Sequence, residues 1–221
     1  MHVWLPEGIT TTAPQIDRLF YAILAITGVV FFLVQATLLA FLITYRRRPN
    51  RPAHYTHGNN LAEIIWTIIP AAILVWLAAY NQRIWARVRG TPPPPDVEVE
   101  IIAEQFAWNV RYAGADGTFD TADDITTLNQ LHLPARQTVL VNLKSKDVIH
   151  SFFVPQFRMK QDAVPGLTTH LWFSATTEGR YEIACAELCG LGHYRMRGFL
   201  TIESPDAFNA WLTQAREEQG T

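Results

Sequence analysis

The stretch Cys185-Ala-Glu-Leu-Cys189-Gly-Leu-Gly-His193-Tyr-Arg-Met196 places two thiols, an imidazole and a thioether within one short segment. Soft sulfur ligands with imidazole are typical of copper, zinc or iron–sulfur centres, and a thioether beside them favours copper. A mononuclear blue-copper site uses a single Cys. Two Cys with this spacing can instead bridge two copper ions, and a second imidazole is then needed. His150, in Lys146-Asp147-Val-Ile-His150-Ser-Phe152, is the best candidate.

Other interpretations of this loop account for fewer of its residues. A disulfide between Cys185 and Cys189 would leave the adjacent His and Met unexplained. A zinc site does not require Met and usually recruits Cys-x-x-Cys pairs. Two other histidines compete with His150 as the upstream ligand, and one other methionine competes with Met196: His132, His170 and Met159.

The sequence on both sides of this loop predicts a sandwich of short strands. Val97–Ile101 alternates apolar and polar residues, as a half-buried strand does, and Gly, Pro and Asp separate the segments. Many short strands with turns between them indicate a β-sandwich. The expected strands are 97–101, 107–112, 138–143, 148–154, 169–173, 180–185 and 198–202.

After the sandwich, residues 204–221 are expected to form a C-terminal helix followed by a short tail. Ser204 can cap it and Pro205 suits its first turn. An apolar face should dock on the sandwich or on a partner. This face comprises Phe208, Trp211, Leu212 and Ala215.

Two apolar segments near the N-terminus are long enough to cross a bilayer. Leu19–Tyr45 and Ile64–Gln82 carry no charged residue, and Pro70 should kink the second, which membrane helices tolerate. We expect a lead at 1–18, a transmembrane hairpin at 19–90 (helices about 19–45 and 64–86), a stiff Pro-rich linker at 91–96 and a metal-binding domain at 97–203. Arg residues lie both in the loop that connects the two segments and on their outer flanks. The positive-inside rule therefore indicates the orientation of the hairpin only through the tight cluster Arg46–Arg48 in the loop.

The loop and the His150 segment together resemble the binuclear CuA motif of cytochrome c oxidase subunit II. The resemblance extends from about Leu19 to about Glu203. It implies a cupredoxin-like Greek-key sandwich, with His150, Cys185, Glu187, Cys189, His193 and Met196 as copper ligands. It also implies that Glu187 contributes its backbone carbonyl to copper and points its carboxylate toward Mg²⁺ at the boundary with subunit I.

The same resemblance assigns partners and location. Electrons would come from a c-type cytochrome or another small periplasmic carrier and would pass to haem in subunit I, where oxygen is reduced and protons are pumped. The chain would lie in a bacterial-type cytoplasmic (inner) membrane, with lipid around its two helices and with both termini and the copper domain on the periplasmic side. The net charge of −2 gives no reason to expect nucleic acid as a partner. No Cys-x-x-Cys-His haem-attachment motif is present, so no fused cytochrome c is expected.

Two further positions receive roles by resemblance. Glu63, at the start of the second span, matches a residue linked to the entrance of a proton path; alternatively it forms a capping pair with Asn60. In Gln105-Phe106-Ala107-Trp108, Phe106 replaces the Trp that commonly receives electrons, and Phe106 with Trp108 would form that surface here. Lys146 stands where an acidic docking residue is common, which predicts a more apolar docking surface.

Alternatives in other classes remain at this point. A quinol oxidase subunit II shares the hairpin and sandwich but lacks copper ligands. Nitrous oxide reductase, another terminal reductase, shares CuA but not the two-helix anchor, and a copper carrier would not need fixed ligands. The acidic segment from Gly114 to Asp124 is interpreted as a solvated hairpin tip, a docking patch for a basic donor, or a calcium site.

Overall fold

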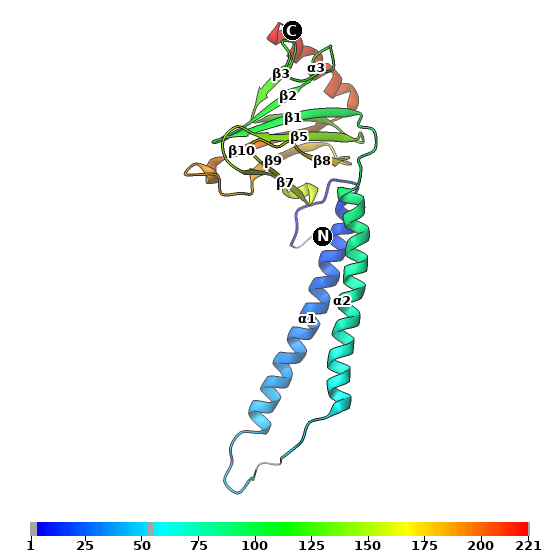
Figure 1. The fold of residues 1–221 in the computed structure, drawn as a ribbon, viewed down its shortest axis with the longest axis vertical. Coiled ribbons are helices and arrows are strands. Elements are labelled where there is room, and N and C mark those ends of the chain that lie inside the picture. The colour runs from blue at the N-terminus through cyan, green and yellow to red at the C-terminus, as the bar shows by residue number, and fades with distance from the viewer. Residues whose placement is uncertain (1–3, 53–54, 221) are drawn as a thin grey trace. The chain divides into compact units, whose positions relative to one another are not determined.

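The computed structural model describes residues 4–52 and 55–220 (Figure 1). Residues 1–3, 53–54 and 221, in the expected lead, hairpin loop and tail, lie outside the described part. The chain divides into a helical unit, residues 15–86, and a β unit formed by residues up to 14 together with those from 87 onward.

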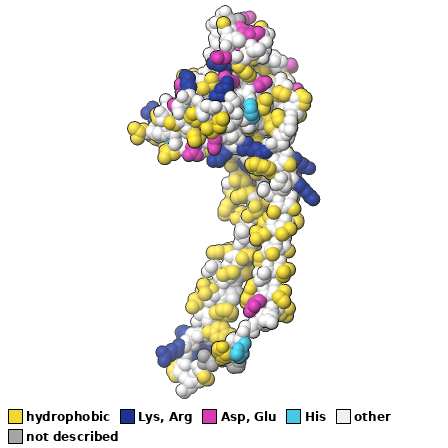
Figure 2. Space-filling view, viewed as in Figure 1, with side chains coloured by type: hydrophobic (Ala, Val, Ile, Leu, Met, Phe, Trp, Pro, Cys, Tyr) yellow, Lys and Arg dark blue, Asp and Glu magenta, His cyan; other side chains and the backbone are white. Residues whose placement is uncertain are grey.

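Two long helices carry the apolar segments: α1 (Ala13–Thr44) and α2 (Asn60–Arg89). Each is long and apolar enough to cross a membrane. Hydrophobic side chains cover much of the surface of both helices (Figure 2). Those of Phe32 and Val75 are each 71% exposed, which suits a lipid surrounding rather than water. Pro70 lies within α2.

Both helices begin earlier than the expected 19 and 64. Helix α1 includes Asp17 and Arg18, and α2 begins at Asn60 and continues through Arg83, Arg87 and Arg89. Hydropathy detects only the uncharged stretch, whereas backbone hydrogen bonding continues into polar residues. The backbone N–H of Ala13 donates to Thr10 Oγ1 at 3.2 Å, which satisfies one free donor at the start of α1.

The β unit is a sandwich of two five-stranded sheets, ordered β3-β2-β1-β5-β8 and β4-β10-β9-β6-β7. Strands β1 and β5 pair in parallel, as do β4 and β10, so the connections cross between sheets. The strands are β1 (Val97–Glu104), β2 (Ala107–Tyr112), β3 (Ile125–Leu128), β4 (Gln130–Pro134), β5 (Val139–Ser145), β6 (His150–Val154), β7 (Met159–Ala163), β8 (Thr169–Phe173), β9 (Gly179–Cys185) and β10 (Arg197–Glu203).

Three strands lie outside the expected segments: β3, β4 and β7. Strand β7 has the polar sequence Met-Lys-Gln-Asp-Ala and exists because it pairs with β6, with Ala163 opposite His150. Asn129, at φ 58°, separates β3 from β4, which sends the chain from one sheet to the other. Partner strands, rather than apolar alternation, define these elements.

An N-terminal strap, residues 6–12, belongs to the β unit and forms part of its core. Ile9 is 1% exposed, and Thr10 pairs with Ala175 as an isolated β-bridge. The Ile9 N–H donates to Gln156 O at 3.0 Å, and the Thr176 N–H donates to Ile9 O at 2.7 Å. Residues 6–12 of the expected lead are therefore an integral piece of the sandwich.

Helix α3 (Pro205–Gln219) closes one end of the sandwich. Ser204 Oγ accepts a hydrogen bond from the Ala207 N–H at 3.3 Å, as expected for the N-cap. Phe208 and Ala215 are buried, and the ring of Trp211 stacks on His132 at 4.2 Å between centroids. The apolar face of the helix thus docks on the chain's own sheet.

Candidate metal centre

The sequence-predicted ligands come from two parts of the sandwich that the fold brings together. His150 is the first residue of β6, and Cys185 is the last residue of β9, which pairs with β6. The chain then turns through Cys189 into a 3-10 helix, His193–Arg195, and Met196 leads into β10. The loop between two antiparallel strands therefore folds over the end of β6.

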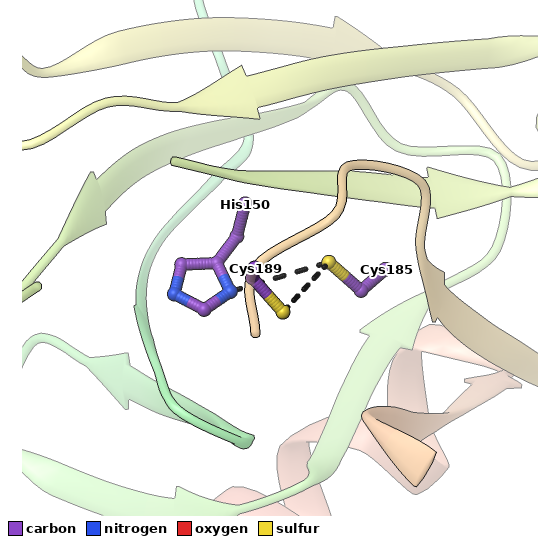
Figure 3. Close-up of side chains that lie close together, drawn as sticks. All are labelled: His150, Cys185 and Cys189. Atoms are coloured by element: carbon purple, nitrogen blue, oxygen red, sulfur yellow. Dashed lines mark hydrogen bonds between the residues drawn. The ribbon is translucent and has the colours of Figure 1, made fainter. Parts of the chain in front are cut away.

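The ligand atoms face one another in a small volume. Cys185 Sγ and Cys189 Sγ are 3.8 Å apart, and Cys189 Sγ lies 3.7 Å from His193 Nδ1 and 3.8 Å from Met196 Sδ. His150 Nδ1 lies 3.2 Å from Met196 Sδ and 4.0 Å from Cys185 Sγ. One potential ligand atom from each of His150, Cys185 and Cys189 falls within 4.8 Å of the others. Figure 3 shows these three side chains gathered together.

This spacing fits metal-bridged thiolates. A disulfide has its sulfurs about 2.05 Å apart, and both Cys residues are free. Two sulfurs bound to one tetrahedral ion at about 2.3 Å lie roughly 3.8 Å from each other, which matches the observed separation. Two thiols, two imidazole nitrogens and a thioether form the soft donor set that copper prefers.

Most of the ligand side chains are buried, and a carboxylate contacts the outer nitrogen of His150. His150 is 0% exposed, while Cys189 and Met196 are each 3% exposed. His150 Nε2 lies 2.8 Å from Asp147 Oδ1, a contact in which Nε2 donates to the carboxylate, and Nδ1 is the nitrogen that faces the sulfur atoms. A carboxylate behind a histidine fixes the tautomer that a metal requires.

The pKa values of the Cys189 thiol and the Asp147 carboxyl are shifted in opposite directions. Burial, and then the neighbouring Cys185, raise the pKa of the Cys189 thiol to about 11 in the metal-free protein. A bound cation would therefore have to displace this proton. Burial acts to raise the pKa of Asp147, but hydrogen bonds from His150, Val148 and Gln105 outweigh it and lower that pKa.

The backbone carbonyl and the side chain of Glu187 have different surroundings. Its carbonyl oxygen lies 3.2 Å from Cys185 Sγ, whereas its side chain is exposed. The structure therefore separates the backbone oxygen, which faces the thiol, from a carboxylate that is accessible to other ligands.

The competing residues lie away from this cluster. His170 Nδ1 is 2.7 Å from Asn142 Oδ1, and His132 Nδ1 is 3.3 Å from Glu203 Oε1. Met159 begins β7 and is buried in the core. Burial lowers the pKa of His132, although Glu203 acts in the opposite direction.

Phe106 and Trp108 have different environments, and this corrects the expected electron-accepting surface. Phe106 is 36% exposed, whereas Trp108 is 0% exposed because β2 turns alternate residues into the core. The Trp108 ring instead packs edge-on against His150, 6.3 Å between centroids. Trp108 therefore cannot contact a donor directly. Three side chains of the loop from Cys185 to Met196 are highly exposed: Leu188 (79%), Leu191 (97%) and Tyr194 (82%).

The acidic segment from Gly114 to Asp124 is a hairpin tip between β2 and β3. Its carboxylates turn inward to the loop's own backbone: Asp123 Oδ2 accepts from the Ala115 N–H at 2.6 Å, and Asp124 Oδ2 accepts from the Asp120 N–H at 2.7 Å. Asp124 also pairs with Arg111 at 3.4 Å. These contacts favour the hairpin-tip interpretation over a docking patch or a calcium site.

Glu63 lies in the first turn of α2 and its side chain is exposed. The cap of this helix is Asn59, not the expected Asn60: Asn59 Oδ1 accepts from the N–H groups of Leu61 at 3.0 Å and Ala62 at 3.1 Å. Asn60 is already helical and cannot serve as the cap. The Glu63 N–H donates to Asn59 O at 3.0 Å.

Together these features define a membrane-anchored subunit that carries a cupredoxin-like domain. Comparison with known proteins specifies the family. Residues 99–203 match the family described as cytochrome c oxidase subunit II, periplasmic domain, and residues 1–84 match its transmembrane domain. The chain therefore belongs to the cytochrome c oxidase subunit II family, whose periplasmic domain is the CuA-binding cupredoxin-like fold.

Individual relatives agree with this assignment. Cytochrome c oxidase subunit 2 of Thermostichus vulcanus is 32% identical, over 96% of this chain and 79% of the relative. Alternative cytochrome c oxidase subunit 2 of Bradyrhizobium diazoefficiens is 31% identical, over 98% of this chain and 85% of the relative. The crystal structure of the periplasmic domain of subunit II of cytochrome oxidase of Bradyrhizobium japonicum is 26% identical, with a TM-score of 0.51, over 58% of this chain and 99% of that structure.

Proposed function

We propose that this chain is the electron-accepting subunit of a cytochrome c oxidase and that it binds a binuclear copper centre. Cys185 and Cys189 would bridge the two ions, and His150 and His193 would each bind one. Met196 and the Glu187 carbonyl would be weak ligands. The observation that carries this proposal is the convergence of both thiols, both Nδ1 atoms and the thioether in one small volume, where all but the half-buried His193 are buried.

When bound, such a centre accepts and releases one electron shared by two ions, with little change in geometry. The chain's own residues keep that geometry constant. His150 is fixed by Asp147, and β6 and β9 are hydrogen-bonded neighbours, so the ligands sit on a rigid scaffold. Burial of Cys189 and Met196 keeps water away from the site.

The donor would be a c-type cytochrome or a similar periplasmic carrier that contacts Phe106, Leu191 and Tyr194. These exposed side chains are apolar or aromatic; Leu191 and Tyr194 belong to the ligand loop, Phe106 lies beside it, and Arg195 lines the same surface. Lys146, which replaces a common acidic docking residue, forms an ion pair with Glu104 at 2.7 Å and so is locally neutralised. The surface therefore favours apolar contact over strong charge steering.

Electrons would then pass to haem in subunit I, where oxygen reduction is coupled to proton pumping. The exposed Glu187 carboxylate would bind Mg²⁺ at the boundary with subunit I, since carboxylates are the ligands that Mg²⁺ prefers. Glu63 would serve the entrance of a proton path. Both termini and the β unit would lie on the periplasmic side of the cytoplasmic membrane.

Copper stoichiometry tests the proposal. The full chain, purified in detergent and loaded with copper, should retain two copper ions per chain after desalting and should be reduced by a c-type cytochrome. Retention of one ion, or of none, would contradict the binuclear assignment; a copper-free chain in an active oxidase would instead favour a quinol donor.

A further inference from the structure

The turn between β1 and β2 is linked to both halves of the ligand set, to one of them through Asp147. This turn is Gln105-Phe106, which follows Glu104 and precedes Ala107. One half of the ligand set is His150 on β6, and the other is the loop from Cys185 to Met196. In the part of the chain that the structure describes, β6 pairs with β9 at Phe152 and Phe153, and the Ala186 N–H donates to Ser151 O at 2.9 Å. These backbone contacts join the two halves within one sheet, and the turn at Gln105 adds a connection from the other sheet.

The first contact runs from Gln105 to His150 through one carboxylate. The backbone N–H of Gln105 donates to Asp147 Oδ2 at 2.7 Å. The other oxygen of the same carboxylate, Oδ1, lies 2.8 Å from His150 Nε2. Asp147 thus orients the imidazole, and the turn orients Asp147.

The second contact runs from Gln105 to the ligand loop. The side-chain amide of Gln105 donates through Nε2 to the carbonyl oxygen of Cys189. Because a carbonyl only accepts, the Gln105 side chain must supply the donor here. The Phe106 ring covers the next residues of the loop: a Cβ at Gly192 would overlap this ring, and one at Gly190 would lie 2.6 Å from Gln105 Nε2.

We propose that Gln105 is a positioning residue for the metal centre, because it ties the His150 half to the Cys189 half through one backbone donor and one side-chain donor. The identity of the bound metal rests on the proposed function above. The tie itself is a property of the metal-free chain. Hydrogen-bonding residues behind metal ligands typically change metal affinity by about 10- to 100-fold when they are replaced.

The decisive variant is Gln105→Met, which retains the length and volume of the side chain but cannot donate. The backbone N–H, and with it the contact to Asp147, remains. The matched control is Gln214→Met on the exposed face of α3, where Gln214 contacts only Glu218 among the bonds that the structure records. Both variants are made in the full chain in detergent, because the N-terminal strap belongs to the β unit.

Two readouts are expected to change in Gln105→Met and not in Gln214→Met. In metal-free protein, hydrogen exchange of the backbone amides from Ala186 to His193 should be about fivefold faster, as the loss of one hydrogen bond implies. In copper-loaded protein, transfer of copper to a chelator should be about tenfold faster, with a shifted visible spectrum. Exchange in the core of β1 and β5 should be unchanged in both.

The outcomes separate the two proposals. Wild-type rates of exchange and copper loss in Gln105→Met would overturn the positioning role, since side-chain volume would then suffice. A wild-type chain that binds no copper would overturn the proposed function, and the metal-free exchange experiment would still decide the role of Gln105.

A second variant, Asp147→Asn, tests the contact between Asp147 and His150. It retains the size of the side chain but replaces one of the two acceptor oxygens, so the imidazole nitrogen signals of His150 should report a mixture of tautomers. An unchanged single tautomer would contradict the tie through Asp147.

Discussion

His150 Nδ1 lies 3.2 Å from Met196 Sδ, although 46 residues separate them in the chain. Neither His132 nor His170 has such a contact with the sulfur cluster, because each is held by its own polar partner, Glu203 or Asn142. The position of β6 beside β9 therefore distinguishes the three histidines more sharply than sequence spacing does.

This difference predicts selective copper loss. His150→Ala should lower the copper content of the full chain by about one ion in two and weaken the remainder, because the imidazole ligand of one ion is lost. His170→Ala and His132→Ala should retain both ions. Metal content of the three purified variants provides the measurement; equal loss in His170→Ala would move the ligand assignment.

A second prediction concerns the docking surface. Phe106→Ala should slow reduction of the copper centre by the native donor severalfold, since Phe106 is exposed and packs on the loop that leads to His193. The bimolecular rate should depend only weakly on ionic strength, because surface charges beyond a Debye length of about 10 Å at 0.1 M salt are screened. Stopped-flow measurements across salt concentration provide the test, and a steep fall with salt would show charge-steered docking.

The role of Glu63 can be separated from the cap of α2. Glu63→Ala in the assembled oxidase should slow proton-coupled turnover while reduction of the copper centre proceeds normally. Asn59→Ala removes the observed cap, and should cost about 1 kcal/mol of helix stability without slowing turnover. Normal turnover in an assembled Glu63→Ala oxidase would rule out the proton-path role.

The N-terminal strap should contribute strongly to the stability of the sandwich. Ile9→Ala should lower the free energy of unfolding of the β unit by about 2–4 kcal/mol, because it leaves a cavity in the core. Trp4→Ala, at a side chain that is 69% exposed, should change it by less than about 0.5 kcal/mol. Thermal or denaturant unfolding of the metal-free full chain measures both, and equal effects would show that the strap is dispensable.

The sequence was informative where chemistry or composition is unusual. The spacing of Cys185, Cys189, His193 and Met196 pointed to one ligand loop, and the uncharged segments of α1 and α2 pointed to a membrane. Strand β7 and the strap could not be found in this way: the polar β7 exists through its pairing with β6, and only Ile9 and Thr10 of the strap are buried.

The hydrogen bonds that support the ligands also could not be predicted from the sequence pattern. No sequence pattern assigns Asp147 or Gln105 a supporting role at the site, because the hydrogen bonds of Gln105 to Asp147 and to Cys189 join segments distant in the chain. The burial of Trp108 could have been predicted, since Trp108, Val110 and Tyr112 alternate along β2 and all three face the core.

The central claim, that Cys185 and Cys189 bridge two copper ions, is tested most directly by the electron paramagnetic resonance spectrum of the copper-loaded full chain. We predict a mixed-valence signal, in which one unpaired electron is shared by two copper nuclei. We also predict its loss in both Cys185→Ser and Cys189→Ser, because a hydroxyl cannot replace a bridging thiolate at neutral pH. A single-copper signal in the wild-type chain, or a retained two-copper signal in either Ser variant, would contradict the bridging assignment.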